Sequence, residues 1–173
     1  MFHLKLEDNM FKRLWDAWRK RDLAQRVRCD GWTGIYVGDY STAPTWAYTI
    51  GFRSSLGSPE IVVFDLPRRS ADGVFQEVFR QLTAGETVLA DGKPWKPEEP
   101  GRFVWRKVHP GRFVDDEEPW LGISVTIDAM MNSSAEDFEA YQLVLSDADG
   151  RLPWEAGYDE RLRPRQRALY DAA

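Results

Sequence analysis

The sequence contains few of the residues on which covalent cross-links and metal sites depend. Among its 173 residues there is one cysteine, Cys29, and there are two histidines, His3 and His109. A single cysteine excludes a disulfide within the chain. Because the first residues also lack the apolar segment of a signal peptide, we expect a reducing, cytoplasmic setting. Neither histidine has a second histidine or a cysteine at ligand spacing, so we expect no metal site.

Long hydrophobic runs and an excess of positive charge are also absent. No stretch approaches the roughly 20 apolar residues that a membrane-spanning helix needs, so we expect no membrane partner. The 23 Lys and Arg against 28 Asp and Glu give a net charge of −5, which argues against a nucleic-acid partner. Residues 1–28 carry +4 (8 basic, 4 acidic) and residues 29–150 carry −10 (10 basic, 20 acidic). A basic segment in front of an acidic body can dock on that body or on a partner, which makes self-association as a homo-oligomer one expectation; the alternative is a solvated helix face.

Several motifs with a defined chemistry are missing. The chain has neither of the glycine-rich loops that bind nucleotide phosphates, and it has no G-x-S-x-G turn of a serine hydrolase. Residues 147–150 (DADG) begin like a calcium-binding loop, but Arg151 and Leu152 occupy the positions where that loop needs an oxygen ligand and a glycine. We therefore expect no cofactor, and we interpret Asp149 and Gly150 as a tight type I′ turn.

The composition that remains is that of a folded domain. Hydrophobic residues make up 43% of the chain and aromatic residues 13%, including eight tryptophans. This supplies enough apolar surface for a core, and a chain of this length usually forms one domain. We expect residues 31–173 to form that domain, with residues 1–30 as an accessory helical segment in front of it.

Two helices are predicted from periodicity. Residues 70–84 place their apolar side chains on one face, with Ser70 as the N-cap and a glycine at position 85. The accessory segment also has a helical pattern and should end at Gly31. The apolar positions of its first half share one face: Phe11, Leu14, Trp15 and Trp18. Because this stripe stops before Lys20, either the helix breaks there or its second half packs against something else.

Six strands are predicted from β-branched and aromatic runs, at residues 32–37, 46–50, 61–66, 103–108, 121–127 and 141–145. The run at 61–66 is almost wholly apolar, which predicts a central strand covered on both faces. Loops are expected at 51–59, 91–101 and 115–118, and a short helix from Ser133 or Ser134 through Glu139. Because the strands outnumber the helices and do not alternate with them, we predict an α+β fold with a mixed or mostly antiparallel sheet and a packed core helix.

Three blocks of sequence resemble those of a known family. Residues 31–32 (GW) with 46–52 (WAYTIGF) resemble its GW and F-A-Y-T-x-G-L block. Residues 58–66 (SPEIVVFDL) resemble H-P-E-L followed by a hydrophobic stretch and F-G-L. Residues 141–155 (YQLVLSDADGRLPWE) resemble Q-L-V-W-P-D-x-x-G-x-F-P-W-E. With order and spacing kept from about Gly31 to Tyr170, the chain is similar to the bacterial family of domains of unknown function numbered 4262.

The resemblance implies no particular reaction, because the family has no established activity. Two departures from the family pattern also matter. Ser58 stands where the family has histidine, so a mechanism that depended on that histidine would not carry over. Asp65 stands where the family has the glycine of F-G-L.

The same blocks contain our candidate site residues. Gly51 allows a sharp turn after the strand that carries Tyr48, and Trp154 is the best candidate for a cavity wall. Glu60 and Glu155 are weaker candidates for an acid–base pair, since an apolar neighbour such as Trp154 raises the pKa of a carboxyl group. We predict that Tyr48, Glu60, Trp154 and Glu155 line one cleft. The structural alternative is that both carboxylates accept hydrogen bonds from backbone or arginine groups.

Three functions from different classes are compatible with these residues. The leading hypothesis is a non-catalytic binding domain for a small molecule or a protein partner, with Tyr48, Gly51 and Trp154 contacting the ligand. The alternative is a hydrolytic enzyme with Glu60 or Glu155 as general acid or base and Tyr48 nearby. A flavin-binding barrel is a third possibility, supported only by the many strands and aromatic residues. An open pocket with shifted pKa values around the carboxylates would favour the enzyme.

Overall fold

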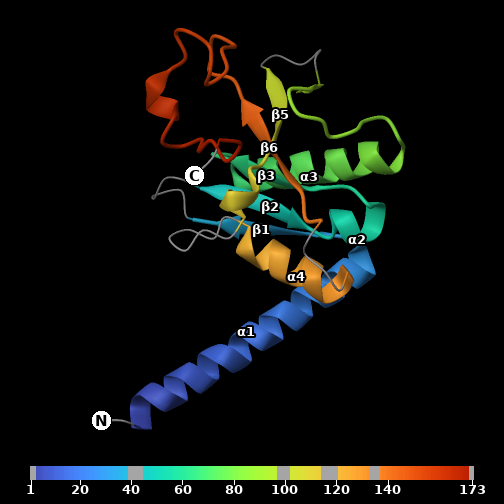
Figure 1. The fold of residues 1–173 in the computed structure, drawn as a ribbon, viewed down its shortest axis with the longest axis vertical. Coiled ribbons are helices and arrows are strands. Elements are labelled where there is room, and N and C mark those ends of the chain that lie inside the picture. The colour runs from blue at the N-terminus through green and yellow to red at the C-terminus, as the bar shows by residue number, and fades with distance from the viewer. Residues whose placement is uncertain (1–2, 39–44, 97–101, 114–120, 133–136, 172–173) are drawn as a thin grey trace.

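A six-stranded sheet forms the centre of the fold (Figure 1). The computed structural model describes residues 3–38, 45–96, 102–113, 121–132 and 137–171, with side chains from residue 17 onward. The helices are α1 (His3–Asp30), α2 (Phe52–Leu56), α3 (Arg68–Thr83) and α4 (Gly122–Asn132). The strands are β1 (Thr33–Val37), β2 (Trp46–Ile50), β3 (Glu60–Phe64), β4 (Pro94–Trp95), β5 (Phe103–Lys107) and β6 (Ala140–Leu145). Two short 3-10 turns, η1 (Pro110–Arg112) and η2 (Glu160–Leu162), complete the elements.

The sheet is mixed and mostly antiparallel. Its strand order is β1-β2-β3-β6-β5-β4, and among these pairs β3 and β6 alone run parallel. Helix α3 buries Ala71, Phe75 and Val78 against one face of the sheet, and α4 and the end of α1 cover the other face. Every residue of β3 is buried, as expected for a strand covered on both faces. The predicted α+β class is confirmed.

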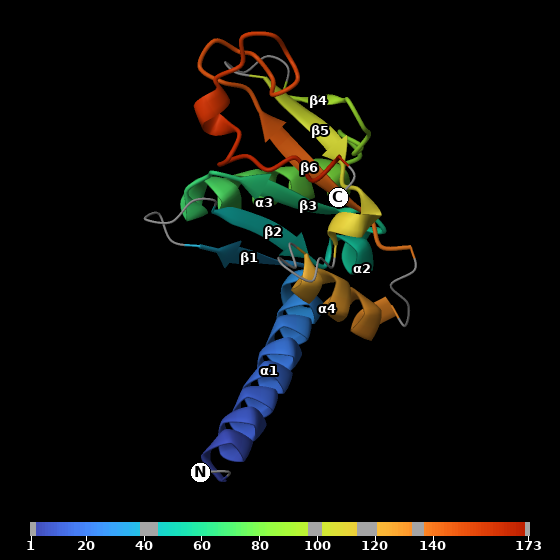
Figure 2. The ribbon, with the colours of Figure 1, turned by 60° about the vertical axis from the view of Figure 1, so that its left-hand side comes forward.

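Helix α1 is continuous through Lys20, so of the two alternatives the packing of its second half holds. Leu23, Ala24 and Val27 are buried on the body of the protein, while the N-terminal part of α1 projects away from it in both views (Figures 1 and 2). The N–H of Gly31 donates to the carbonyl of Val27 at 2.9 Å and ends the helix as predicted. No helix in the described ranges is both long enough and apolar enough to cross a membrane.

Most of the predicted elements form with small shifts of their ends. The five strands predicted at 32–37, 46–50, 61–66, 103–108 and 141–145 correspond to β1, β2, β3, β5 and β6, and helix 70–84 corresponds to α3. The predicted cap is wrong, because the N-cap of α3 is Pro67 and no side chain caps that end. At the other end Gly85 has a φ of 69° and its N–H donates to the carbonyl of Leu82 at 3.1 Å.

The strand predicted at 121–127 is wrong, since these residues belong to α4 and the turn before it. Alternating β-branched residues suggested a strand, but Leu121, Ser124, Ile127 and Asp128 are the buried positions, which is the spacing of a helix. Ser124 makes a tertiary hydrogen bond, in which its hydroxyl donates to the carbonyl of Thr49 at 3.0 Å. Because two of the buried positions are serine and aspartate, the pattern of apolar residues alone does not predict this helix.

Three loop predictions also need correction. The segment 51–59 contains α2, and 91–101 contains β4. The turn at Asp149 and Gly150 is not type I′, because that type needs a positive φ at both residues, and Gly150 has one (79°) whereas Asp149 does not. The short helix predicted through Glu139 falls largely outside the described residues, and residues 137–139 are not helical. The acidic segment 115–118 lies outside the described residues.

Candidate functional site

A pocket of about 260 Å³ opens beside β5, between the loop that follows β6 and the C-terminal segment. Three arginines, two aromatic rings and one carboxylate form most of its wall: Arg106, Arg163, Arg167, Trp154, Tyr170 and Asp171. Small-molecule sites usually measure roughly 300 to 1,000 Å³. The pocket lies just below that range and therefore suits a very small ligand.

Arg106 and the two rings contact one another in this wall. The guanidinium carbon of Arg106 lies 4.3 Å from the ring centroid of Tyr170 and 4.9 Å from that of Trp154. The two rings meet edge to face, with their centroids 5.8 Å apart. The Nε of Arg106 donates to Oδ1 of Asp91 at 3.0 Å. Cation–π contacts and an ion pair thus hold the guanidinium in one orientation.

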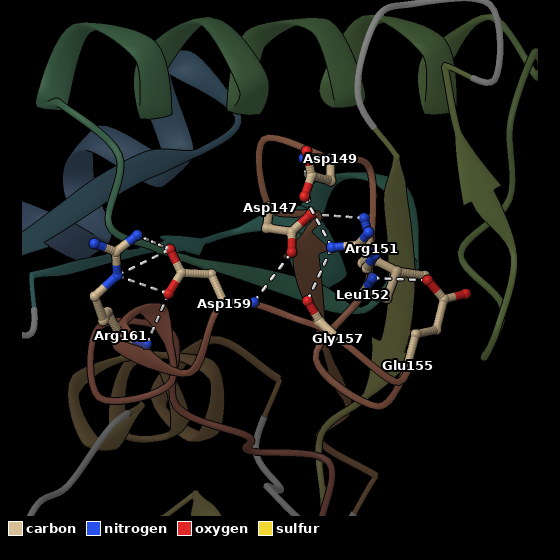
Figure 3. A network of polar contacts seen from close by, with 8 residues as sticks. All are labelled: Asp147, Asp149, Arg151, Leu152, Glu155, Gly157, Asp159 and Arg161. Carbon is tan, nitrogen blue, oxygen red and sulfur yellow. Dashed lines mark hydrogen bonds and ion pairs between the residues drawn. The ribbon is translucent and has the colours of Figure 1, made fainter.

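Asp147 organises the loop that carries the tryptophan (Figure 3). Its Oδ1 accepts from the backbone N–H groups of Asp149 at 3.0 Å and Arg151 at 2.8 Å, and its Oδ2 accepts from that of Asp159 at 3.1 Å. Burial raises the pKa of the Asp147 carboxyl, but these backbone donors outweigh it and lower the pKa overall. One ionised side chain therefore ties together the two ends of a 13-residue loop.

Glu155 fixes the turn in which Trp154 lies. Its Oε2 accepts from the N–H of Leu152 at 2.9 Å, and its own N–H donates to the carbonyl of Leu152 at 2.8 Å. Nη1 of Arg102 donates to both carboxylate oxygens at 2.7 Å. The Arg102 guanidinium and the Leu152 N–H hold the pKa of Glu155 below its usual value. The expectation that Trp154 raises this pKa is wrong, because Glu155 turns away to charged and backbone donors.

Two glutamines attach the C-terminal wall of the pocket to β6. Nε2 of the fully buried Gln142 donates to the carbonyl of Arg167 at 2.7 Å, and its Oε1 accepts from the N–H of Leu169 at 2.9 Å. In return, the side chain of Gln166 accepts from the N–H of Leu145 at 2.7 Å and donates to its carbonyl at 2.9 Å. The Gln166 amide takes the place of a neighbouring strand at Leu145, where the pairing of β6 with β3 has ended. The Gln142 amide fixes the backbone that leads to Tyr170.

Glu60 lies at the other end of the sheet. Its Oε2 accepts from the hydroxyl of Thr49 at 2.6 Å, and its Oε1 accepts from the N–H groups of Gly51 at 2.8 Å and Arg53 at 3.2 Å. Burial raises the pKa of Glu60, while these hydrogen bonds oppose the rise. The carboxylate joins the end of β2 to the start of α2, which is a structural role.

Tyr48 and Gly51 are packed inside the protein. Tyr48 is 2% exposed in the core between the sheet and α1, and burial raises its pKa to about 12. Gly51 has a φ of 112°, and a Cβ there would lie 2.7 Å from both the carbonyl oxygen of Gly31 and Cγ1 of Val27. The predicted sharp turn at Gly51 is present, and it allows the end of α1 to approach α2.

The structure does not bring the four predicted cleft residues together. Glu60 pairs with Ala140 at the start of β6, whereas Glu155 contacts Arg102 beyond its end. A strand of this length spans roughly 17–20 Å, so the two carboxylates cannot act as an acid–base pair. Of the four, Trp154 lines the pocket. In the described part of the chain, no three His, Cys, Asp or Glu side chains are grouped to hold a metal ion.

Sequence reasoning missed Arg106 and the C-terminal residues of the pocket. Arg106 lies between Val104 and Val108 on one face of a predicted strand. A charged residue between two buried valines indicates that its side chain contacts other groups of the protein or a ligand. Tyr170 and Arg167 follow no such pattern. They belong to the wall because Gln142 and Gln166 fold the C-terminal segment back, and sequence periodicity does not report such side-chain bonds.

Comparison with known proteins gives one match. The model of a family described as domain of unknown function (DUF4262) matches residues 26–159. The match includes the end of α1, the sheet and the loop with Trp154, and it ends before residues 160–170, which the sequence resemblance had included. No curated protein and no solved structure matches the chain.

Proposed function

We propose that this chain, which belongs to the DUF4262 family, is a non-catalytic binding domain that takes a small molecule in the pocket between Trp154 and Tyr170. The observation that carries the proposal is the pocket itself, a hollow of about 260 Å³ with two aromatic rings in its wall. Small-molecule sites are typically concave, with apolar walls and a few convergent polar groups.

The anchoring of the pocket walls supports this function. Asp147 and Glu155 fix the loop of Trp154 through backbone hydrogen bonds, and Gln142 fixes the segment of Tyr170. A wall that is ordered before the ligand arrives loses less conformational entropy on binding. These contacts therefore favour a preformed site.

Binding without catalysis fits the positions of the two glutamates that the sequence offers as acid–base candidates. A general acid or base must come within hydrogen-bond reach of the bound substrate. Neither Glu60 nor Glu155 lines the pocket, and the carboxylate of Glu155 is occupied by Arg102. Tryptophan, tyrosine and arginine also suit a protein partner, but a small hollow favours a small ligand over a flat protein surface.

The test uses the full chain labelled with 5-fluorotryptophan and observed by fluorine NMR. Trp154→Phe assigns the resonance of Trp154, and Trp18→Phe assigns that of a second exposed tryptophan, on α1, as the matched control. Benzyl alcohol, benzoate and phenyl phosphate are titrated separately to millimolar concentration. We expect at least one probe to shift the Trp154 resonance saturably and leave that of Trp18 in place. If none of the three does so, the proposed site is wrong.

A further inference from the structure

We infer that the ligand of this pocket is a small organic carboxylate, and that the fork of Arg106 binds its carboxylate group. The inference rests on the proposed function and adds the chemical class of the ligand. It follows from three features of the described residues: the free donors of Arg106, the balance of charges around it, and the apolar surface beside the two rings.

Arg106 has donors that the protein does not use. Its Nε is bonded to Asp91, and within the described ranges no hydrogen bond or ion pair takes the N–H groups of its two terminal nitrogens. The rings of Tyr170 and Trp154 hold the guanidinium plane, and the side chain contributes to the pocket lining. A planar guanidinium fixed in this way matches the two oxygens of a carboxylate in bidentate geometry.

The surrounding charges favour a ligand with a single negative charge. The lining contains three arginines, of which Arg163 is paired with Glu160 and Arg106 with Asp91. With Asp171 in the lining as well, three carboxylates balance the three arginines. Arg167 makes no ion pair in the described part of the chain. Because Asp171 offsets the charge of Arg167, the wall has no surplus positive charge for a dianion such as a phosphate monoester, and a monoanion adds the smaller uncompensated charge.

Part of the wall offers apolar contact. The amide of Gln166 is committed to the backbone of Leu145 and to the hydroxyl of Tyr158. Pro153 and Ala168 present apolar surface beside the rings. The body of the ligand is therefore small and apolar or flat, and recognition of its polar end depends on the arginines.

The first test compares three probes of similar size in the fluorine titration of Trp154. We expect benzoate to bind at least about tenfold more tightly than benzamide, because a charge-assisted bidentate contact is lost in the amide. Phenyl phosphate should bind more weakly than benzoate. Equal affinities for benzoate and benzamide would overturn the carboxylate assignment and leave the binding pocket standing. Preference for phenyl phosphate would overturn the single-charge argument. Binding of none of the probes would refute the proposed function itself.

Substitutions then test whether Arg106 is the residue that binds the carboxylate. We expect Arg106→Lys to weaken benzoate binding about tenfold and to change benzamide binding little, since lysine cannot form the fork. Arg161→Lys is the matched control, because Arg161 is exposed, pairs with Asp159 and lies outside the pocket lining. If Arg106→Lys does not fold, Asp171→Asn tests the assignment instead, because it removes a negative charge at the exposed rim of the pocket. It should tighten benzoate binding about 1.5-fold to fivefold. Unchanged or weaker benzoate binding in Asp171→Asn, or no selective loss in Arg106→Lys, would contradict the assignment.

Discussion

The substitution Gln142→Ala tests how the pocket wall is held. It removes the partners of the Arg167 carbonyl and the Leu169 N–H, which Gln142 binds at 2.7 Å and 2.9 Å. A buried backbone group without a partner costs about 1–3 kcal/mol, so two such groups bound the loss at about 2–6 kcal/mol. Arg167 is exposed and water can reach part of the segment, so we expect a value in the lower half of this range, near 3 kcal/mol. That is a large share of the roughly 5–15 kcal/mol of a typical domain.

Urea unfolding followed by circular dichroism measures this loss. With a slope of about 2 kcal/mol per molar urea, the midpoint should fall by roughly 1.5 M. Gln76→Ala on the exposed face of α3 is the matched control and should change the free energy of unfolding by less than about 0.5 kcal/mol. Gln142→Met keeps the side-chain length without the amide, so it should lose nearly as much as alanine. The account is refuted if Gln142→Ala behaves like the Gln76 control, or if methionine restores full stability.

Two further predictions concern Gly51 and Glu155. Gly51→Ala places a Cβ 2.7 Å from the Gly31 carbonyl oxygen at a φ of 112°, and the left-handed backbone and the overlap together should cost about 3 kcal/mol, or a fall in Tm of about 6–12 °C. Gly57→Ala, at a φ of 64° with open space around it, should lose less than half as much in the same calorimetric scan, and equal losses would contradict the packing argument. The depressed pKa of Glu155 stabilises the fold above the usual pKa of a glutamate, and this contribution is lost as the pH falls through the depressed value. In urea unfolding from about pH 5 to about pH 3, wild type should therefore lose more stability than Glu155→Gln. Parallel curves would show that the ion pair with Arg102 has no effect.

The sequence predicts the core of the fold well because hydrophobic periodicity decides it. Strand β3 and helix α3 are buried in the pattern that their apolar residues predict. Periodicity fails at α4, where Ser124 and Asp128 take buried helical positions through tertiary contacts. It also misses α2, a five-residue helix joined to β2 by the carboxylate of Glu60. In both cases, a polar contact with a residue outside the helix accompanies the local structure.

Only the part of the candidate site that depends on local sequence was predictable. The position of Trp154 between Pro153 and Glu155 marks an exposed aromatic ring at a turn, and this ring lines the pocket. The grouping with Tyr48 and Glu60 was wrong because sequence spacing does not tell which end of a strand a loop returns to. Tyr170 and Arg167 reach the pocket through the amides of Gln142 and Gln166, a type of contact without a periodic signal.

The most direct test of the pocket is a crystal structure of the full chain grown with 4-bromobenzoate, recorded at the bromine absorption edge. The anomalous signal locates the ligand without any assumption about its site. We expect a bromine peak in the pocket, with the carboxylate on the terminal nitrogens of Arg106 and the ring beside Trp154. An empty pocket, or a peak only elsewhere on the protein, would contradict the claim that this pocket is the binding site.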